Sequence, residues 1–259
     1  MRVPFFQIDA FASAPFTGNP AAVMPLEAWL PDETLQAIAA ENNLAETAFL
    51  VKEPGGWRIR WFTPEIEIDL CGHATLASGF VAFEELGVPG TSVTFQSRSG
   101  PLTVSRKDGL LELDFPSRPP RPCPVPAGLF EALGLPPGEV QKARDHMVVL
   151  GSEAEVRTLK PDLNAFAKVE VFSAIVTAPG DSVDFVSRFF SPFAGVPEDP
   201  VTGSAHCTLV PYWAGRLGKD RLHALQVSKR GGELHCENRG ERVGIAGRAV
   251  KVLEGTFLL

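Results

Sequence analysis

An internal repeat constrains the fold of this 259-residue chain more than any other feature of its sequence. The motif RWFTP at positions 60–64 returns as RFFSP at 188–192, and GHATL at 72–76 returns as GSAHCTL at 203–209. The offset is 128 residues between the arginines (188 − 60) and 131 residues between the glycines (203 − 72). Repeat arrays have periods of roughly 20–50 residues, so a period near half the chain length indicates a duplication into two related domains.

Each copy of the repeat predicts a strand, a short loop and a buried helix. Residues 57–62 and 184–190 are rich in aromatic residues and alternate in character, which is typical of strands. From 73 to 83 the chain is almost wholly small or apolar, and a helix that is apolar on nearly every side is buried. The second helix is predicted to begin near Gly203, and Pro211 is expected to kink or shorten it.

The sequence around these helices favours β-structure. Residues 30–42 form the exception, since they read as an amphipathic helix with Asp32 as its cap. Short apolar runs separated by Gly, Pro or polar turns predict strands at 5–11, 47–51, 92–96, 102–105 and 110–115. These elements predict a curved sheet wrapped around one buried helix, made twice.

The fold class expected from this pattern is α+β with two pseudo-symmetric domains. The proline-rich stretch 116–122 is expected to be the linker, because so many prolines cannot continue a sheet or a helix. The domains are therefore predicted at 1–116 and 123–251, and the last strand, 252–259, is expected to cross back to the first of them.

Composition and charge narrow the class of protein. The chain is that of a globular protein, with 44% hydrophobic and 21% charged residues, and its net charge of −7 argues against coating nucleic acid or an anionic membrane. No signal peptide and no membrane span is recognisable. The four scattered cysteines indicate reduced thiols in a cytoplasmic protein. No metal site is expected, because His73, His206 and Cys207 have no ligand-pair spacing.

The two buried helices offer a means of binding an anion. They are expected to start at Gly72 and Gly203, and a helix N-terminus presents unpaired N–H groups and the positive end of the dipole. Two such ends could hold a carboxylate without any net positive charge. The alternative is that Thr202 and Ser204 simply cap the second helix.

Three polar residues beside these elements are candidates for proton transfer. Glu46 lies between a helix end and an apolar strand, where a partly desolvated carboxylate suits general acid–base work. His73 falls in the first turn of the first helix, and Asp199 lies in the loop before the second. The alternatives are an edge carboxylate in water, a histidine satisfied by a nearby carbonyl and a loop aspartate facing a helix dipole.

Five blocks in this order resemble the phenazine-biosynthesis-like (PhzF) family. They extend from Gln7 to about Lys219 and read QIDAF (7–11) with PFTGNPAAV (15–23), NNLAETAF (42–49), RWFTP (60–64), LCGHATLA (70–77) and DPVTGSAH (199–206). The resemblance implies a diaminopimelate-epimerase-like fold, with a β-barrel-like sheet around a central helix in each domain and the active site between the domains. It also implies an isomerase of a biosynthetic type that needs no cofactor, often as a homodimer.

The resemblance assigns roles to individual residues. Glu46 would shuttle the proton, and His73, Asp199 and Ser204 would complete the catalytic set. The backbone N–H groups of Gly72 and Gly203 would bind the substrate carboxylate, and Asn19 would also contact the substrate. The substrate is expected to be a small carboxylate-bearing metabolite.

Two other functions remain open at this point. The chain could be a metabolite-binding protein without catalytic activity that kept the pocket. It could also be a thiol racemase, in which two cysteines act on opposite sides of one carbon. Cys71 precedes Gly72, but its repeat partner before Gly203 is Thr202, so one of the two thiols is missing. Cys71 is then a small buried residue.

Overall fold

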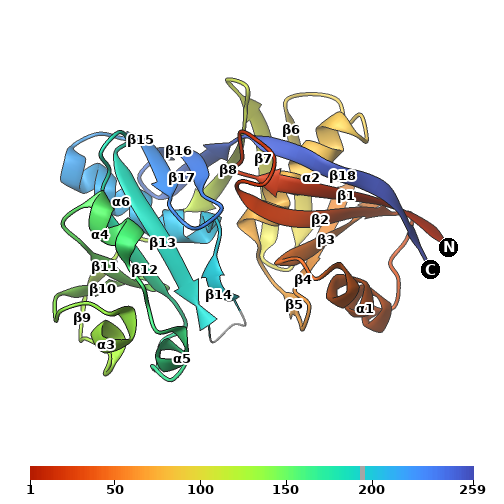
Figure 1. The fold of residues 1–259 in the computed structure, drawn as a ribbon. Coiled ribbons are helices and arrows are strands. Elements are labelled where there is room, and N and C mark those ends of the chain that lie inside the picture. Colours follow the sequence, from red (N-terminus) through yellow and green to blue (C-terminus); the bar gives the residue numbers. More distant parts are fainter. Residues whose placement is uncertain (193–195) are drawn as a thin grey trace. The chain divides into compact units, whose positions relative to one another are not determined.

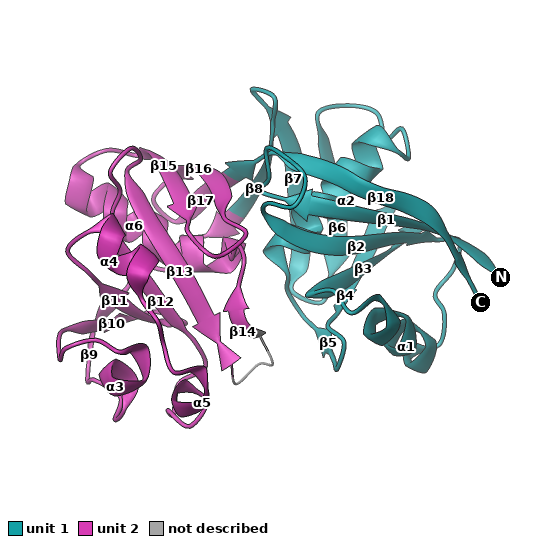
Figure 2. Cartoon of the chain, viewed as in Figure 1, with its two compact units in different colours: residues 1–114, 246–259 teal, residues 115–245 magenta. Residues whose placement is uncertain are grey.

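The computed structural model describes residues 1–192 and 196–259, and it is mostly β-sheet with few helices (Figure 1). The chain divides into two compact units (Figure 2). Unit 1 contains residues 1–114 and 246–259, and unit 2 contains residues 115–245. No helix in these described ranges is long and apolar enough to cross a membrane.

Unit 1 is built from one long run of strands and two helices. In chain order its elements are β1 (Arg2–Ala10), β2 (Asn19–Leu26), α1 (Asp32–Asn42), β3 (Glu46–Glu53), β4 (Gly56–Phe62), β5 (Glu67–Ile68), α2 (Gly72–Glu84), β6 (Ser92–Ser97), β7 (Gly100–Lys107), β8 (Leu110–Pro116), which runs on into unit 2, and β18 (Ala249–Leu258). The strand β18 pairs antiparallel with β1 from Arg2 to Ala10, so the last strand of the chain completes the sheet that the first one begins. The predicted strands and helices of this half are therefore confirmed as elements.

The helix α2 is the centre of unit 1. All but two of its residues, Phe80 and Glu84, are buried, and it contacts β1, β2, β3, β7 and β18. A Cβ atom at Gly79 would lie 2.5 Å from Cγ1 of Val104, so glycine allows the closest approach between α2 and β7. The apolar sequence of 73–83 is thus explained by burial on every side.

Unit 2 repeats this plan around the helix α6 (Gly203–Leu217) and adds further short helices. Its elements are β9 (Arg121–Cys123), α3 (Leu129–Leu133), β10 (Val140–Lys142), β11 (His146–Val149), α4 (Glu153–Thr158), α5 (Leu163–Phe166), β12 (Ala174–Pro179), β13 (Phe185–Ser191), β14 (Val196–Asp199), α6, β15 (Arg221–Gln226), β16 (Gly232–Asn238) and β17 (Arg242–Gly247), which ends in unit 1. The buried helix α6 contacts β15 and β16.

The strand pairing of the two units is the same. In unit 1, β2 is parallel to β3, β3 is antiparallel to β4, and β4 is parallel to β6. In unit 2, β11 is parallel to β12, β12 is antiparallel to β13, and β13 is parallel to β15. The predicted duplication is confirmed by this common order.

Side chains of the repeated motifs also keep their contacts. Arg60 binds both carboxylate oxygens of Glu67 at 2.7 and 2.8 Å, and Arg188 binds both oxygens of Glu198 at 2.7 and 2.9 Å. Each guanidinium also lies over the phenylalanine ring two residues later in the motif. A bidentate pair that also stacks on an aromatic ring requires arginine rather than lysine, which explains why both copies contain it.

The N-terminal half of unit 1 departs from one expectation. Asp32 does not cap α1, because the N-cap residue is Pro31 and no side chain bonds to the helix start. Instead, the Asp32 carboxylate accepts a hydrogen bond from Nη1 of Arg60 at 2.8 Å. The arginine also lowers the pKa of Asp32 through this bond and its charge.

Unit 2 departs from three expectations. The predicted linker contains the strand β9, in which Pro122 pairs with Gln141, and the predicted loop before α6 contains β14. The helix α6 continues past Pro211 to Leu217, so the proline does not shorten it. Proline cannot donate to the carbonyl four residues earlier. The backbone N–H of Arg118 donates to that carbonyl, of Cys207, at 2.8 Å and so compensates for the loss.

We expect Gly18→Ala to destabilise the protein more than Gly87→Ala. Both glycines have positive φ, +68° and +62°, so alanine costs each about 1–2 kcal/mol in backbone strain. Only at Gly18 would the new Cβ meet a backbone atom, the Ala10 carbonyl oxygen at 2.2 Å, whereas Gly87 has open space. The clash should add about 1–3 kcal/mol. Equal losses in urea-denaturation midpoints would contradict this packing.

Candidate active site

A tight turn between β1 and β2 positions Asn19. The backbone N–H of Phe16 donates to Oδ2 of Asp9 at 2.9 Å, and both Phe16 and Gly18 have positive φ. The turn delivers Asn19 as the first residue of β2, with its side chain fully buried. The QIDAF and PFTGNPAAV segments thus build the turn that delivers Asn19 to the start of β2.

The segment NNLAETAF positions Glu46 at the start of β3. Asn43 ends α1 in the left-handed conformation, with φ of 49°, which asparagine tolerates better than most residues. The side chain of Asn42 then donates to Oγ1 of Thr47 at 3.0 Å. Since Thr47 and the next residues of β3 are buried, Glu46 lies at the rim of the core, with its side chain 13% exposed.

The start of α2 positions His73. The N-cap residue, Cys71, makes no side-chain cap, and the first turn contains no acidic residue. The N–H groups of this helix end are therefore not neutralised by a side chain of the helix itself. His73, its second residue, is 5% exposed.

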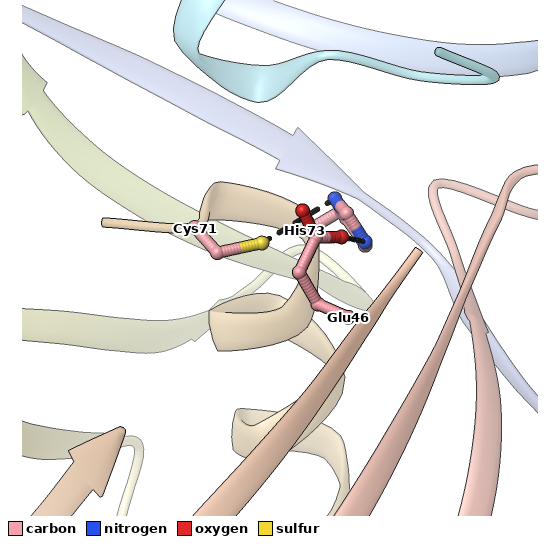
Figure 3. Close-up of side chains that lie close together, drawn as sticks. All are labelled: Glu46, Cys71 and His73. Carbon is pink, nitrogen blue, oxygen red and sulfur yellow. Dashed lines mark hydrogen bonds and ion pairs between the residues drawn. The ribbon is translucent and has the colours of Figure 1, made fainter. Parts of the chain in front are cut away.

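These residues form one cluster within unit 1 (Figure 3). Nε2 of His73 lies 2.9 Å from Oε2 of Glu46, and on the other side of the ring Nδ1 lies 3.1 Å from Nδ2 of Asn19 and 3.6 Å from Sγ of Cys71. The imidazole thus lies between a carboxylate on one side and an amide and a thiol on the other. Glu46, His73 and Asn19, which the sequence singles out, are brought together.

The contact between Glu46 and His73 is short, but its geometry is not that of a well-aligned hydrogen bond. Although their atoms are 2.9 Å apart, Oε2 of Glu46 and Nε2 of His73 are both buried and have no hydrogen-bond partner among the described residues. Buried polar atoms are usually paired, so an unpaired couple in one place marks a functional site. Catalytic hydrogen bonds are often poorly aligned in the free enzyme and tighten when substrate binds.

The electrostatics of the cluster favour a charged imidazole. Burial opposes the charge, but Cys71 and Glu46 raise the pKa of His73 well above its ordinary value. Burial also raises the pKa of Cys71 to about 11, so Cys71 is a neutral thiol near pH 7. With Cys71 neutral, the contact with Glu46 is the remaining influence that raises the pKa of His73.

Asn19 is suited to follow the protonation of His73. When Nδ2 donates to Nδ1, the ring nitrogen is an acceptor and the neutral imidazole carries its proton on Nε2, toward Glu46. The same amide turned by 180° presents Oδ1, which accepts from the protonated Nδ1. The sequence resemblance assigns Asn19 to the substrate, and the structure places its side chain against His73.

Glu46, Cys71 and His73 are close enough together to surround a metal ion, since one ligand atom of each lies within 4.8 Å of the others. The donor set suits proton transfer better. Cys71 is protonated near neutral pH, and it contacts the ring nitrogen opposite the one that faces Glu46. A histidine binds one ion through one nitrogen.

Asp199 is the last residue of β14 in unit 2, three residues before Thr202, the N-cap of α6. The hydroxyl of Thr202 donates to Oδ2 of Asp199 at 2.5 Å. The side chain of Gln226 bonds the backbone of both residues: its Oε1 accepts from the Thr202 N–H at 2.8 Å, and its Nε2 donates to the Asp199 carbonyl at 2.7 Å. Sequence reasoning missed Gln226, which is buried on β15 and carries no motif signal.

Ser204 is the second residue of α6 and is partly exposed. Thr202 is the N-cap but makes no side-chain bond to the helix start, so the expectation that Thr202 and Ser204 simply cap this helix is not met.

The two helices begin in the same way. The carbonyl of Thr202 bonds to Nδ1 of His206 at 2.9 Å, just as the Cys71 carbonyl accepts from the Thr75 hydroxyl in α2. Gly72 and Gly203 are the first residues of the two helices, as predicted.

Only unit 1 carries the glutamate and histidine. Arg60 pairs with Phe49 and Arg188 pairs with Val176, so the position three residues before each partner is Glu46 in unit 1 and Ser173 in unit 2. Ser173 is buried and donates to Asp145. The two halves share a fold but not a catalytic pair.

We expect Glu46→Gln to lower the pKa of His73. The folded-state pKa exceeds the ordinary value, so the pair contributes stability that is complete below about pH 6.5 and is lost as the pH rises through the folded value. Histidine NMR titrations of both proteins measure the shift. His206 of unit 2 is the internal control, because burial lowers its pKa to about 4 and Glu46 is not among the groups that shift it. An unchanged His73 titration would show that Glu46 does not act on it.

Relatives of known sequence and structure cover the whole chain. Two uncharacterized isomerases of Pseudomonas aeruginosa are 55% and 52% identical, each over 100% of both chains. The crystal structure of a phenazine biosynthesis protein PhzF family member from Enterococcus faecalis covers 100% of both chains, with 49% identity and a TM-score of 0.97. A predicted epimerase of Pseudomonas aeruginosa shares the fold alone, at 22% identity, a TM-score of 0.73 and 99% coverage of both chains.

The structural likeness confirms the fold inferred from the sequence. The names of the similar proteins support an isomerase family without identifying a substrate. The model of the family described as phenazine biosynthesis-like protein matches residues 8–255, which is nearly the full length. This match, together with the repeat and the clustered residues, shows that the chain belongs to the phenazine biosynthesis-like (PhzC-PhzF) family.

Proposed function

We propose that the protein is a cofactor-independent isomerase that moves a proton on a small carboxylate-bearing metabolite, with Glu46 as the general acid and base. The observation that carries the proposal is the buried Glu46–His73 contact, in which both facing atoms have no hydrogen-bond partner among the described residues. A largely buried carboxylate that faces an imidazole in this way can take up a substrate proton and return it.

The proposed reaction needs only one proton and one residue. The Glu46 carboxylate removes a proton from a substrate carbon, and the electron pair left behind spreads into the neighbouring unsaturated system. Glu46, now protonated, returns the same proton to another carbon of that system and is regenerated. His73 lies 2.9 Å away and holds the carboxylate in place. As negative charge grows on the substrate, positive groups nearby lower the barrier.

The start of α2 supplies such a positive group without a cation. Gly72 and His73 open a buried helix whose N-terminus has no side-chain cap. Backbone N–H groups and the helix dipole at this position favour a carboxylate. The role of Asn19 in this proposal is to hold His73 through Nδ1, at 3.1 Å, rather than to bind the substrate alone.

Unit 2 supplies further candidates. Gly203 also opens a helix without a side-chain cap. Asp199 precedes this helix, and Ser204 is its second residue. We propose that Asp199 and Ser204 act on the same substrate, Asp199 through polar proton exchange and Ser204 as a hydrogen-bond donor. Gln226 would then be a positioning residue for the loop that carries Asp199.

The thiol racemase is the less favoured alternative. Cys71 lies in the cluster, but burial raises its pKa to about 11, which leaves little thiolate near pH 7. The matching residue before Gly203 is Thr202, so the second thiol is missing. A binding protein without activity is distinguished from the proposed isomerase only by turnover.

We expect Glu46→Gln to abolish proton transfer while keeping the fold and ligand binding. The amide fills the same space but cannot take up a proton, so the loss should be roughly 10²–10⁴-fold. Small unsaturated or hydroxylated carboxylic acids are screened in deuterium oxide, and incorporation of deuterium at carbon is followed by NMR or mass spectrometry. Glu46→Asp is the matched variant, which keeps the carboxylate. Equal exchange in wild type and Glu46→Gln would remove Glu46 from the mechanism.

Cys71→Ser separates the two chemistries. With Glu46 as the base, the variant keeps exchange within about tenfold of wild type, because the serine hydroxyl can still contact Nδ1 of His73. A thiol racemase would lose its activity in the same variant while Glu46→Gln kept it. Measuring both variants on one substrate therefore decides between the glutamate and the thiol.

A further inference from the structure

The strands β15 and β16 form an antiparallel hairpin in unit 2 (Figure 1). Its outward face carries two histidines and a glutamate. Residues of both strands alternate between core and surface, as period-two side-chain geometry requires. The inward positions are apolar apart from Gln226, and include Leu222, Ala224, Leu234 and Cys236. The outward positions include His223, Glu233 and His235.

The sheet register brings these three side chains together. His223 and His235 are direct cross-strand partners, and their rings are stacked with centroids 4.7 Å apart and an angle of 5°. Glu233 lies two residues before His235, on the same face of β16. Its Oε1 atom is 2.7 Å from Nε2 of His223 and 3.8 Å from Nε2 of His235. One ligand atom of each residue lies within 4.8 Å of the other two.

The simplest alternative is an ordinary pair between Glu233 and His223 on a solvated face. That pair explains one histidine but not the stacking of a second against it, since two charged imidazoles placed face to face across strands would repel. When neutral, each ring offers a nitrogen lone pair beside the same carboxylate oxygen. Imidazole nitrogen with one carboxylate is a donor set that zinc and similar divalent ions prefer.

We propose that His223, Glu233 and His235 bind a divalent transition-metal ion of the zinc type, with solvent completing a tetrahedral shell. The three side chains are 39–44% exposed, so an ion can enter directly from solution. Ligand bonds of roughly 2.0–2.2 Å place the ligand atoms about 3.3 Å from one another. The distances of 2.7 and 3.8 Å reach that value through small side-chain rotations.

Two adjustments accompany binding. The stacked rings must turn so that both lone pairs converge, and the second torsion of histidine is soft enough to allow it. The Nε2 atom of His223 that faces Glu233 must be free of its proton to bind the ion, and the neutral ring then carries that proton on Nδ1. The bound ion bridges β15 and β16 and raises the unfolding temperature of the protein, because it binds the folded state.

The proposal is independent of the isomerase reaction, because its residues lie on other elements than Glu46 and His73. The test uses purified full-length protein treated with chelator, and ZnCl2 titrated by calorimetry and by competition with a chromophoric chelator. We expect the ion affinity to fall at least tenfold in His223→Ala, His235→Ala and Glu233→Gln, since loss of a residue that merely orients a ligand already costs roughly 10–100-fold.

Arg221→Ala is the matched control. Arg221 lies on the same outward face of β15, pairs with Glu237 at 3.7 Å and is not a ligand, so its variant should bind zinc at least as tightly as wild type. Cys71→Ser reports on the other cluster that could hold an ion, and it should leave the hairpin affinity unchanged.

Two results would overturn the proposal. One is zinc affinity in the three hairpin variants equal to that of wild type. The other is zinc binding that disappears in Cys71→Ser and persists in His235→Ala, which would assign the ion to the Glu46 cluster. Zinc-soaked crystals give a second readout, because an anomalous peak is expected between His223, Glu233 and His235. Variants that fail to fold are recognised by circular dichroism, and the peak in wild-type crystals then decides.

Discussion

The burial of one apolar helix in each unit determines what the rest of this structure can do. In unit 1, α2 has lost almost all contact with water and its sheet packs so closely that Gly79 has no room for a side chain. A helix buried in this way cannot leave its first N–H groups to solvent, and no side chain of its own caps them. The helix start is therefore the natural place for a polar ligand, and His73 and Glu46 are located there.

The duplication gives this arrangement twice, but only unit 1 places a glutamate and a histidine at these positions. Both helices begin at glycine, have uncapped N-termini and bond their N-cap carbonyl from a side chain four residues later. The strand register places Ser173 where unit 1 has Glu46, and the helix starts place Ser204 where unit 1 has His73. A single proton-transfer pair on a doubled scaffold fits a reaction in which one residue both removes and returns the proton, rather than one with a base from each half.

Much of the fold could be predicted because its signals are local. The paired motifs, the apolar run at 73–83 and the alternation of 57–62 each fix an element from neighbouring residues. The errors came from distant partners. Arg60 draws Asp32 away from a capping role, and the Arg118 N–H lets α6 continue through Pro211. Neither contact leaves a trace in the local sequence.

The candidate site divides in the same way. Glu46 and His73 stand in recognisable motifs, but their contact depends on β3 and α2 meeting. The roles of Asn19 and Gln226 likewise depend on partners distant in the sequence, the His73 side chain and the backbone at Thr202. The pair of His223 and His235 is invisible without the register of β15 and β16, because a shift by one residue would send one of the two into the core.

A buried carboxylate beside a buried imidazole is weak support for a fold, since removing two charges from water costs several kcal/mol per ion in real proteins. A stabilising pair would need good alignment and further hydrogen bonds to offset that cost. The Glu46–His73 pair has neither, because its atoms approach to 2.9 Å without alignment and have no hydrogen-bond partner among the described residues. The couple is therefore better explained by the proposed proton transfer than by a contribution to the stability of unit 1.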